Sequence, residues 1–235
     1  MIVPFGLHEA EGAVLLDQLR GLRGGVEIVL VRVDGCSLPM AVKNDGVVVR
    51  VCTSAAGRAR QMNVGAQAAR GRWLWFVHAD SRLRARTLPA LETFLASNND
   101  ALGYFDLRYR DGPTLAHLNA LGANLRARWF GLPFGDQGLV LPAAWFARLG
   151  GYDEGAGYGE DHLLVWHARQ AGLPLRRLAA TLESSARKYT EHGWWCTTTR
   201  HLRLTVRQAW PEWRASHRRT ADAAATHDRE AAHDQ

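Results

Sequence analysis

The sequence predicts an α/β fold in which a mixed, mostly parallel β-sheet is flanked by helices. Two observations lead to this expectation. Short aliphatic runs alternate along the chain with longer segments of helical composition, and turn residues separate the two kinds of segment. The length of 235 residues fits one large domain, or one domain with a C-terminal extension.

The expected strands are apolar runs bounded by glycine, aspartate or other polar residues. They lie at residues 2–5, 26–33, 47–52, 73–77, 102–109 and 139–141. The run at 26–33 is mostly aliphatic rather than alternating, which is typical of a strand covered on both faces. This run therefore predicts a strand inside a layered fold.

The expected helices carry apolar residues at helical spacing or are rich in alanine and glutamine. They cover residues 10–22, 57–70, 87–95, 115–130 and 160–171. Thr87 is expected to cap the third helix and Gly172 to end the fifth. Their alternation with the strands favours a parallel arrangement.

Composition argues against several classes of protein. The chain is 47% hydrophobic and 22% charged, near the globular average, so wholesale disorder and collagen-like repeats are excluded. The longest apolar runs fall far short of the roughly 20 residues that a membrane span needs, and the first residues do not resemble a secretory signal. The three cysteines form no Cys-x-x-Cys pair. These features predict a cytoplasmic protein.

Charge is unevenly distributed. Residues 1–175 carry +2, residues 176–219 carry +7 and residues 220–235 carry −3, within a total of +6. The nearly neutral first part gives no support to a nucleic-acid groove across the domain, so no nucleic-acid partner is expected. The last stretch is rich in alanine, histidine and aspartate without apolar periodicity, and we expect residues 220–235 to be disordered.

Residues 191–219 are expected to form a basic amphipathic helical segment. Its apolar residues near one helical face are Trp195, Leu202, Val206 and Ala209. Arginines on a neighbouring face are Arg200, Arg203 and Arg207. The pattern fits an interfacial helix on the inner face of a membrane, where it could meet a lipid-linked acceptor. It fits somewhat better a helix that packs its tryptophan face on the core while its arginines stay in water, and Pro211 is expected to kink or end either helix.

Acidic residues follow two of the expected strands and open one helix. Asp34 and Asp80 come directly after strands, where ligands bind in open α/β sheets, and a carboxylate there suits a ribose, a base or a hard cation. Each aspartate could equally cap a turn. Glu160 and Asp161 follow a glycine-dense loop, and one of them is a candidate general base. The favourable helix dipole alone explains one acid but not two.

An ordered set of motifs completes the pattern. They are Asp34-Gly35-Cys36-Ser37, Gly57-Arg58-Ala59-Arg60-Gln61-Met62-Asn63, His78-Ala79-Asp80, Gly135-Asp136-Gln137-Gly138, Gly159-Glu160-Asp161 and Ser184-Ser185-Ala186-Arg187-Lys188. Together they resemble family 2 glycosyltransferases with the GT-A fold, most closely a small bacterial branch with Gly-Arg-Ala-x-Gln-Met-Asn and His-Ala-Asp motifs. The resemblance covers roughly residues 1–190, which it marks as the catalytic domain.

The resemblance implies a donor side of the site. Asp34 would contact the base or ribose of a nucleotide-sugar donor, with Arg58 and Gln61 nearby. Asp80 matches the last acid of the family's Asp-x-Asp motif and would bind a divalent cation, Mg²⁺ or Mn²⁺, that bridges the donor diphosphate. Positive charge near the leaving phosphate would come from Arg187 and Lys188.

The resemblance also implies the reacting side. Asp161 matches the catalytic base of the family's Glu-Asp motif, with Glu160 beside it, and Asp136 and Gln137 would line the acceptor side. The implied reaction is an inverting transfer of a sugar to an acceptor hydroxyl group.

Three departures from the family pattern stand out. His78 takes the place of the first acid of Asp-x-Asp, although His-Ala-Asp is the form typical of the branch. The usual Asn of the N-terminal Pro-x-x-Asn-Glu pattern is replaced by His8. Leu38 and Pro39 stand where an aspartate often follows.

Three alternative functions remain. A nucleotide-sugar-binding protein without transferase activity would keep Asp34 and Asp80 but tolerate the loss of Asp161. A nucleic-acid binder depends on the basic segment alone. A sugar nucleotidyltransferase lacks support, because the glycine-rich, arginine-containing loop of that class is missing after the first strand.

Overall fold

The computed structural model describes residues 1–6, 12–19, 25–36 and 47–233, with side chains described as far as Arg214. His8, Leu38, Pro39 and the ends of the expected helix at 10–22 lie outside the described residues. The strands are β1 (Ile2–Phe5), β2 (Glu27–Val33), β3 (Val48–Ser54), β4 (Trp73–Trp75), β5 (Arg82–Leu83), β6 (Leu102–Tyr109), β7 (Val140–Pro142) and β8 (Leu175–Ser184).

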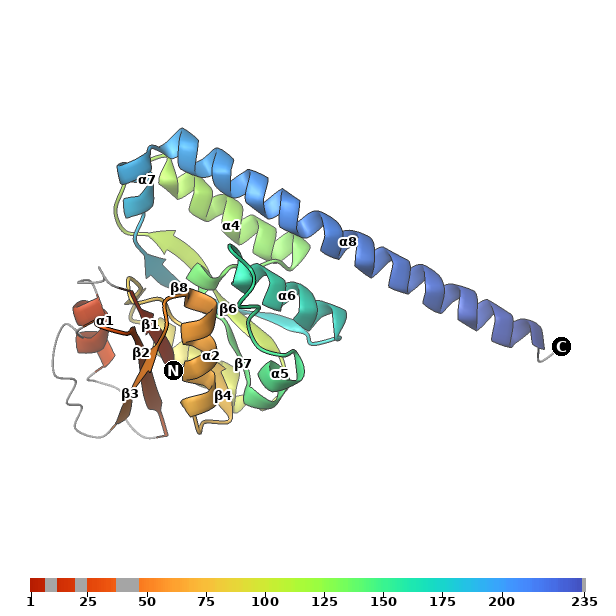
Figure 1. Ribbon diagram of the computed structural model, residues 1–235, viewed down its shortest axis with the longest axis horizontal. Coiled ribbons are helices and arrows are strands. Elements are labelled where there is room, and N and C mark those ends of the chain that lie inside the picture. The colour runs from red at the N-terminus through yellow and green to blue at the C-terminus, as the bar shows by residue number, and fades with distance from the viewer. Residues whose placement is uncertain (7–11, 20–24, 37–46, 234–235) are drawn as a thin grey trace.

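Helices lie between and after these strands (Figure 1). They are α1 (Gly12–Leu19), α2 (Arg58–Ala68), α3 (Thr87–Ala96), α4 (Ala116–Phe130), the 3₁₀ turn η1 (Gly135–Gln137), α5 (Ala143–Arg148), α6 (Glu160–Gln170), α7 (Arg187–His192) and α8 (Trp194–His233). The expected helices are confirmed within the described residues. Thr87 is the first residue of α3 rather than its cap, and its hydroxyl accepts the Arg84 N–H at 2.9 Å.

The strands form two sheets, and the fold is mixed α/β as expected. Strands β1, β2 and β3 are parallel neighbours in that order. The second sheet has the order β4-β7-β6-β8-β5, in which only β6 and β8 pair in parallel. A parallel bridge between Ile2 and Phe76 joins the two sheets. Strand β8 was not predicted, because its mixture of arginine, alanine and leucine also suits a helix.

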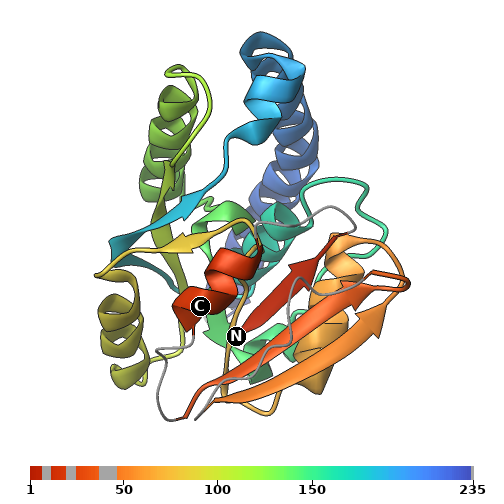
Figure 2. The same cartoon turned by 90° about the vertical axis from the view of Figure 1, so that its left-hand side faces the viewer.

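Helices cover both faces of the sheets and create separate hydrophobic cores, two of which meet at strand β2. Ile28 and Leu30 of β2 belong to the core shared with α1 and α3, whereas Val29 and Val31 belong to the core shared with α2, α5 and α6. Burial on both faces explains the aliphatic run that the sequence places here. Figure 2 shows the three parallel strands with α1 on one side and α2 on the other.

Helix α4 packs through small residues. Ala116, Ala120, Ala123 and Ala127 are buried against the strands, whereas leucines of the same helix point to solvent. Alanine at the contact lets the helix axis approach the strand β6 closely. The usual amphipathic order is therefore reversed on α4, with its larger apolar side chains outside.

Helix α8 leaves the domain as a 40-residue helix that includes Pro211 (Figure 1). Proline lacks an N–H donor, yet Pro211 lies inside this helix and does not end it, so of the two expected effects only a kink stays a prediction. The helix continues to His233, so no helix end separates residues 191–219 from the tail that the sequence predicts at 220–235. The division into a domain at 1–190, a basic segment at 191–219 and a tail stays a prediction.

Alanine substitutions at two helical glycines should change the stability of the fold in opposite directions. A Cβ at Gly65 of α2 would lie 2.5 Å from Ile2 Cγ2 and 2.9 Å from Val31 Cγ2, whereas a Cβ at Gly122 of α4 would meet nothing within 4 Å. We expect Gly65→Ala to destabilise the fold by about 1–3 kcal/mol through overpacking. Gly122→Ala should stabilise it by roughly 0.5–1 kcal/mol through helix propensity. Urea unfolding measures both, and unchanged stability in Gly65→Ala would contradict the close packing of α2.

Candidate active site

A cavity of about 360 Å³ opens where the carboxyl ends of β1 and β8 meet the segment after β4. Its polar lining comes from elements far apart in the sequence. The residues include Gly6, Arg58, Gln61, His78, Asp80, Asp136, Ser184, Ser185, Arg187 and Lys188. Polar side chains at the carboxyl ends of strands are the usual position of a ligand site in an α/β sheet.

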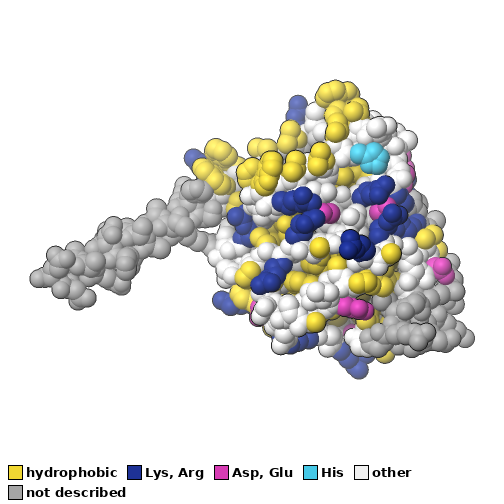
Figure 3. Space-filling view, turned by 180° about the vertical axis from the view of Figure 1, so that it is seen from behind, with side chains coloured by type: hydrophobic (Ala, Val, Ile, Leu, Met, Phe, Trp, Pro, Cys, Tyr) yellow, Lys and Arg dark blue, Asp and Glu magenta, His cyan; other side chains and the backbone are white. Residues whose placement is uncertain are grey.

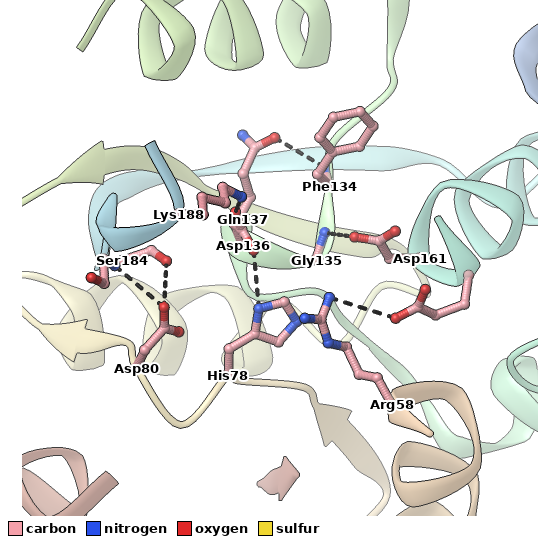
Figure 4. Close-up of polar contacts among 12 residues, drawn as sticks. Arg58, His78, Asp80, Phe134, Gly135, Asp136, Gln137, Asp161, Ser184 and Lys188 are labelled. Atoms are coloured by element: carbon pink, nitrogen blue, oxygen red, sulfur yellow. Dashed lines mark hydrogen bonds and ion pairs between the residues drawn. The ribbon is translucent and has the colours of Figure 1, made fainter. Parts of the chain in front are cut away.

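His78, Asp136 and Lys188 form the centre of this cavity (Figure 4). The Nδ1 atom of His78 lies 3.0 Å from Asp136 Oδ1, and the Lys188 ammonium lies 3.5 Å from Asp136 Oδ2. The segment after β4, the turn η1 and helix α7 each supply one of the three. One carboxylate thus connects three segments of the chain.

The charges in this group shift each other's pKa. Burial alone would raise the pKa of Asp136, but Lys188, the hydrogen bond from His78 and Arg58 hold it well below its usual range. Burial and Arg58 lower the pKa of His78, yet its hydrogen bond to Asp136 and the charges of Asp136 and Asp80 raise it overall. The group therefore places an aspartate of lowered pKa next to a histidine of raised pKa.

Asp80 lies on one side of His78, and its carboxylate has weak partners. Its Oδ2 atom accepts hydrogen bonds from Ser184 Oγ at 3.3 Å and from the Ser185 N–H at 3.4 Å. The donors lie at the end of β8 and directly after it, and both residues line the cavity. The long distances leave this carboxylate able to take a further ligand.

Asp161 lies on the other side of His78 (Figure 4), and Glu160 precedes it in the first turn of α6. Asp161 Oδ2 accepts the backbone N–H of Gly135, and Arg58 Nη1 lies 3.7 Å from Glu160 Oε1. Burial and the charge of Asp161 raise the pKa of Glu160, and Arg58 offsets part of that shift. Asp161 is thus the half-buried acid with a fixed orientation, and Glu160 is the buried acid paired with an arginine.

A second cavity of about 410 Å³ adjoins the first at Arg58. It is lined by Gly57, Arg58, Arg60, Glu154, Tyr158 and Glu160, among others. The Arg58–Glu160 pair therefore separates two openings, one rich in cations and one formed by the glycine-dense loop before α6.

Sequence comparison points to one family. Residues 30–141, a little under half of the chain, match the model of Glycosyl transferase family 2. The match supports the resemblance that the motifs indicate. No curated protein sequence gives a significant match.

Solved structures of glycosyltransferases share the fold. A TarS 1–349 structure from S. aureus, in complex with UDP, is 18% identical with a TM-score of 0.59, over 79% of this chain and 59% of that one. The mannosyltransferase PcManGT from Pyrobaculum calidifontis, in complex with GDP-Man and Mn²⁺, is also 18% identical, with a TM-score of 0.65, over 89% of this chain and 63% of that one. This chain therefore has the expected GT-A fold and spans less than two thirds of the length of either structure.

The structure separates the predicted site residues into two groups. Those that line the cavities are Arg58, Asp80, Asp136, Glu160, Arg187 and Lys188, and Asp161 joins them through its Oδ2, which accepts the N–H of Gly135, the neighbour of Asp136. The others are Asp34, Gln61 and Gln137, for which the structure gives different surroundings.

Asp34 is exposed at the end of β2 and is not among the lining residues of either cavity. Gln61 touches the first cavity, but its amide donates to the carbonyls of Phe5 at 2.8 Å and Val31 at 2.9 Å and so fixes α2 to the sheet. Gln137 is fully buried, and its amide donates to the Phe105 carbonyl at 3.0 Å. Both glutamines therefore bind backbone carbonyl groups of the strands.

Gln208 of α8 was missed by the sequence analysis. Its amide nitrogen donates to the carbonyls of Tyr158 at 2.8 Å and Gly159 at 3.1 Å, and its oxygen lies 3.1 Å from His162 Nδ1. These contacts hold the loop directly before Glu160. A single glutamine among arginines and tryptophans gives no sequence signal for such a role.

Asp136→Asn should lower the pKa of His78. The substitution removes the charge and hydrogen bond that raise this pKa, while burial and Arg58, which lower it, remain. An NMR titration of the His78 ring, assigned with His78→Gln, measures the change, and Asp153→Asn on an exposed loop is the matched control. An unchanged His78 pKa would contradict the assigned pairing.

The pairing of His78 with Asp136 also predicts how the stability of the fold changes with pH. Because the pKa of His78 is raised in the folded protein, its stabilising contribution is complete below the usual histidine value of about 6.5. It is lost as the pH rises through the raised value. Asp136→Asn should remove this dependence, and chemical unfolding across that pH range tests it.

Proposed function

We propose that this chain transfers a sugar from a nucleotide-diphosphate-sugar donor to an acceptor hydroxyl group, with inversion at the anomeric carbon. One observation carries the proposal: a cavity with Arg58, Arg187 and Lys188 in its lining lies beside the oriented carboxylate of Asp161. Cations that can hold a diphosphate and an acid that can take a proton are the two requirements of this reaction.

The donor's diphosphate would occupy the first cavity. Lys188 already lies next to Asp136, and Arg187 of the same helix lies 3.4 Å from Glu191 Oε1. A diphosphate that enters can take hydrogen bonds from these cations in addition to their present ones. The structures in complex with UDP and GDP-Man support uridine and guanosine diphosphates as the nucleotides to test first.

Asp80 fits a divalent cation held by one protein carboxylate and the donor's phosphates. Its carboxylate lines the cavity and keeps only weak hydrogen bonds to Ser184 and Ser185. Among the described residues no group of three or more His, Cys, Asp or Glu side chains forms a complete metal site. Mg²⁺ and Mn²⁺ commonly bind through one or two carboxylates plus substrate phosphates. When bound, such a cation offsets negative charge on the departing diphosphate.

Asp161 is the proposed general base. The Gly135 N–H fixes Oδ2, and the His162 N–H at 2.8 Å from Oδ1 fixes the other oxygen. As the acceptor oxygen forms its bond to the anomeric carbon, its proton passes to Asp161. The bond from that carbon to the diphosphate oxygen breaks, and the electron pair leaves with the nucleoside diphosphate. Glu160 acts as a positioning residue through Arg58.

The second cavity is the proposed entry for the acceptor. Tyr158 and Glu154 line it, and Glu160, the neighbour of the proposed base, forms its boundary with the first cavity. Asp136, which the resemblance places on the acceptor side, lies in the first cavity between His78 and Lys188. We therefore propose that Asp136 organises the site rather than binding the acceptor.

The location of the protein is also a proposal. The described helices include none that is both long and apolar enough to cross a bilayer. We propose that the enzyme acts in the cytoplasm, with a lipid-linked acceptor as one candidate substrate at the membrane face.

Asp161→Asn should bind donor and fail to turn over. Removal of a general base costs about a hundredfold to ten-thousandfold in rate, and the asparagine amide keeps the size of the side chain. Release of nucleoside diphosphate from UDP- and GDP-sugars measures turnover, and Asp153→Asn is the isosteric control on the preceding loop. Full turnover in Asp161→Asn would remove this residue from the mechanism.

The alternative is a nucleotide-sugar-binding protein without transferase activity. A wild-type chain that binds a donor but releases no nucleoside diphosphate with any acceptor would favour it.

Binding of a nucleoside diphosphate should depend on a divalent cation through Asp80. A thermal-shift panel of UDP, GDP, ADP and CDP with Mn²⁺ or with EDTA measures this. Ligand at a hundredfold excess over its Kd stabilises a fold by about 2.7 kcal/mol. We expect one nucleotide to raise the Tm only with Mn²⁺, and Asp80→Asn to lose that cation-dependent part. Equal shifts with Mn²⁺ and EDTA would exclude Asp80 as a metal ligand.

A further inference from the structure

Helix α4 presents its large apolar side chains to solvent. Leu118 is 57% exposed, Leu121 54% and Trp129 73%, although the helix offers alanines to the core. The exposed residues lie three and eight positions apart, which at 3.6 residues per turn places them on one face of the helix. Scattered exposed leucines need no explanation, but a continuous stripe on the face opposite the core does.

Helix α8 carries a matching stripe. Trp195 is 73% exposed, Leu202 64% and Val206 57%, again at helical spacing. The opposite side of α8 contacts the domain, since Gln208 binds the loop before α6 and Glu212 accepts a hydrogen bond from Gln170 at 2.9 Å. Polar residues of α8 face the domain, and the apolar residues on its other side are therefore exposed to solvent.

The two stripes belong to one surface. Asn119 of α4 accepts a hydrogen bond from Trp194 Nε1 at 2.6 Å and donates one to Thr198 Oγ1 at 3.1 Å, so α4 and the start of α8 are neighbours (Figure 1). Figure 3 shows hydrophobic side chains gathered along the upper part of the molecule, where these helices lie, with Lys and Arg side chains beside them. We name this surface, formed by the six residues of the two stripes, the α4–α8 surface.

Cationic residues border the α4–α8 surface. Arg200, Arg203 and Arg207 of α8 are exposed, and the described part of the chain gives them no ion pair. Their helical positions lie next to the stripe of Trp195, Leu202 and Val206. Residues 176–219 carry +7, whereas residues 1–175 carry +2, so the positive charge gathers on the part of the chain that holds this helix.

We infer that the α4–α8 surface docks on a membrane that contains anionic phospholipid. Tryptophan and leucine on one side of a helix with arginine alongside is the combination that inserts at a lipid interface while meeting anionic headgroups. The arginine border gives this surface a charge complementary to such lipids and opposed to a second copy of itself. Lipid binding concerns surface residues remote from the cavities and goes beyond the proposed sugar transfer.

Docking would also hold the second cavity near the membrane surface. Gln208 lies on the docked helix and binds the carbonyl of Tyr158, which lines that cavity. This step rests on the proposed function: an acceptor hydroxyl at the membrane surface would meet the cavity that adjoins Glu160.

Sedimentation of the full chain with vesicles tests the inference. Vesicles of equal parts phosphatidylcholine and phosphatidylglycerol should pellet the wild-type protein, and pure phosphatidylcholine should pellet far less. Leu118→Glu with Leu121→Glu should weaken binding about tenfold or more, because two exposed apolar side chains that would enter the lipid interface are replaced by acids. Neutralising Arg200, Arg203 and Arg207 to Gln should weaken binding and remove its salt sensitivity.

Matched variants control for folding and for net charge. Val14→Glu introduces an acid at an exposed valine of α1, and Arg70, Arg86 and Arg148 to Gln removes three exposed arginines elsewhere; both should bind like wild type. Circular dichroism melting checks each fold without reference to sugar transfer. Wild-type protein that stays in the supernatant, or α4 variants that bind normally, would overturn the inference. A dimer by light scattering that Leu118→Glu with Leu121→Glu makes monomeric, without vesicle binding, would assign the surface to a second copy.

Discussion

The pairing of the Asp136 carboxylate is the interaction on which the arrangement of the site depends. Asp136 lies in η1, His78 follows β4 and Lys188 lies in α7, so one side chain joins three segments that are remote in the sequence. Removing one partner of a mostly buried ion pair costs about 3–5 kcal/mol, because the remaining charge stays out of water. The turn and the helix therefore keep their positions relative to the sheet.

Gly135 transmits that constraint to the proposed base. It precedes Asp136, and its N–H holds Asp161. A Cβ at Gly135 would lie 2.6 Å from Asp161 Oδ2 and 3.1 Å from His78 Nε2. Only glycine lets the turn carry Asp136 on one side and approach Asp161 on the other. One backbone segment, at Gly135 and Asp136, thus fixes both the Asp136 carboxylate in the first cavity and the orientation of Asp161.

Sequence patterns predicted most of the fold and part of the site, and the misses have physical causes. Aliphatic runs such as 26–33 identify strands because burial on two faces leaves no alternation to confuse with a helix. Strand β8 escaped because its arginines occupy exposed positions of a half-covered strand. Gln137 was assigned to the acceptor side because a motif records which residue is present and not where its amide points; here it binds the carbonyl of Phe105. The partner of the Glu160 loop, Gln208, could not be found, since the contact joins residues about fifty positions apart.

The charges of the first cavity explain why a diphosphate would need an additional cation to bind there. Each protein cation at its edge already has an acidic partner: Lys188 has Asp136, Arg58 has Glu160, and Arg187 has Glu191. A diphosphate that enters must share these cations with the protein's own carboxylates, so their net attraction for it is small. Asp80 adds a further negative charge to the same lining. A cavity balanced in this way holds a diphosphate well only when additional positive charge enters with it, and the weakly bonded carboxylate of Asp80 is the group able to receive that charge. The proposed cation dependence thus follows from the internal pairing of the cavity and does not require a cluster of acidic ligands.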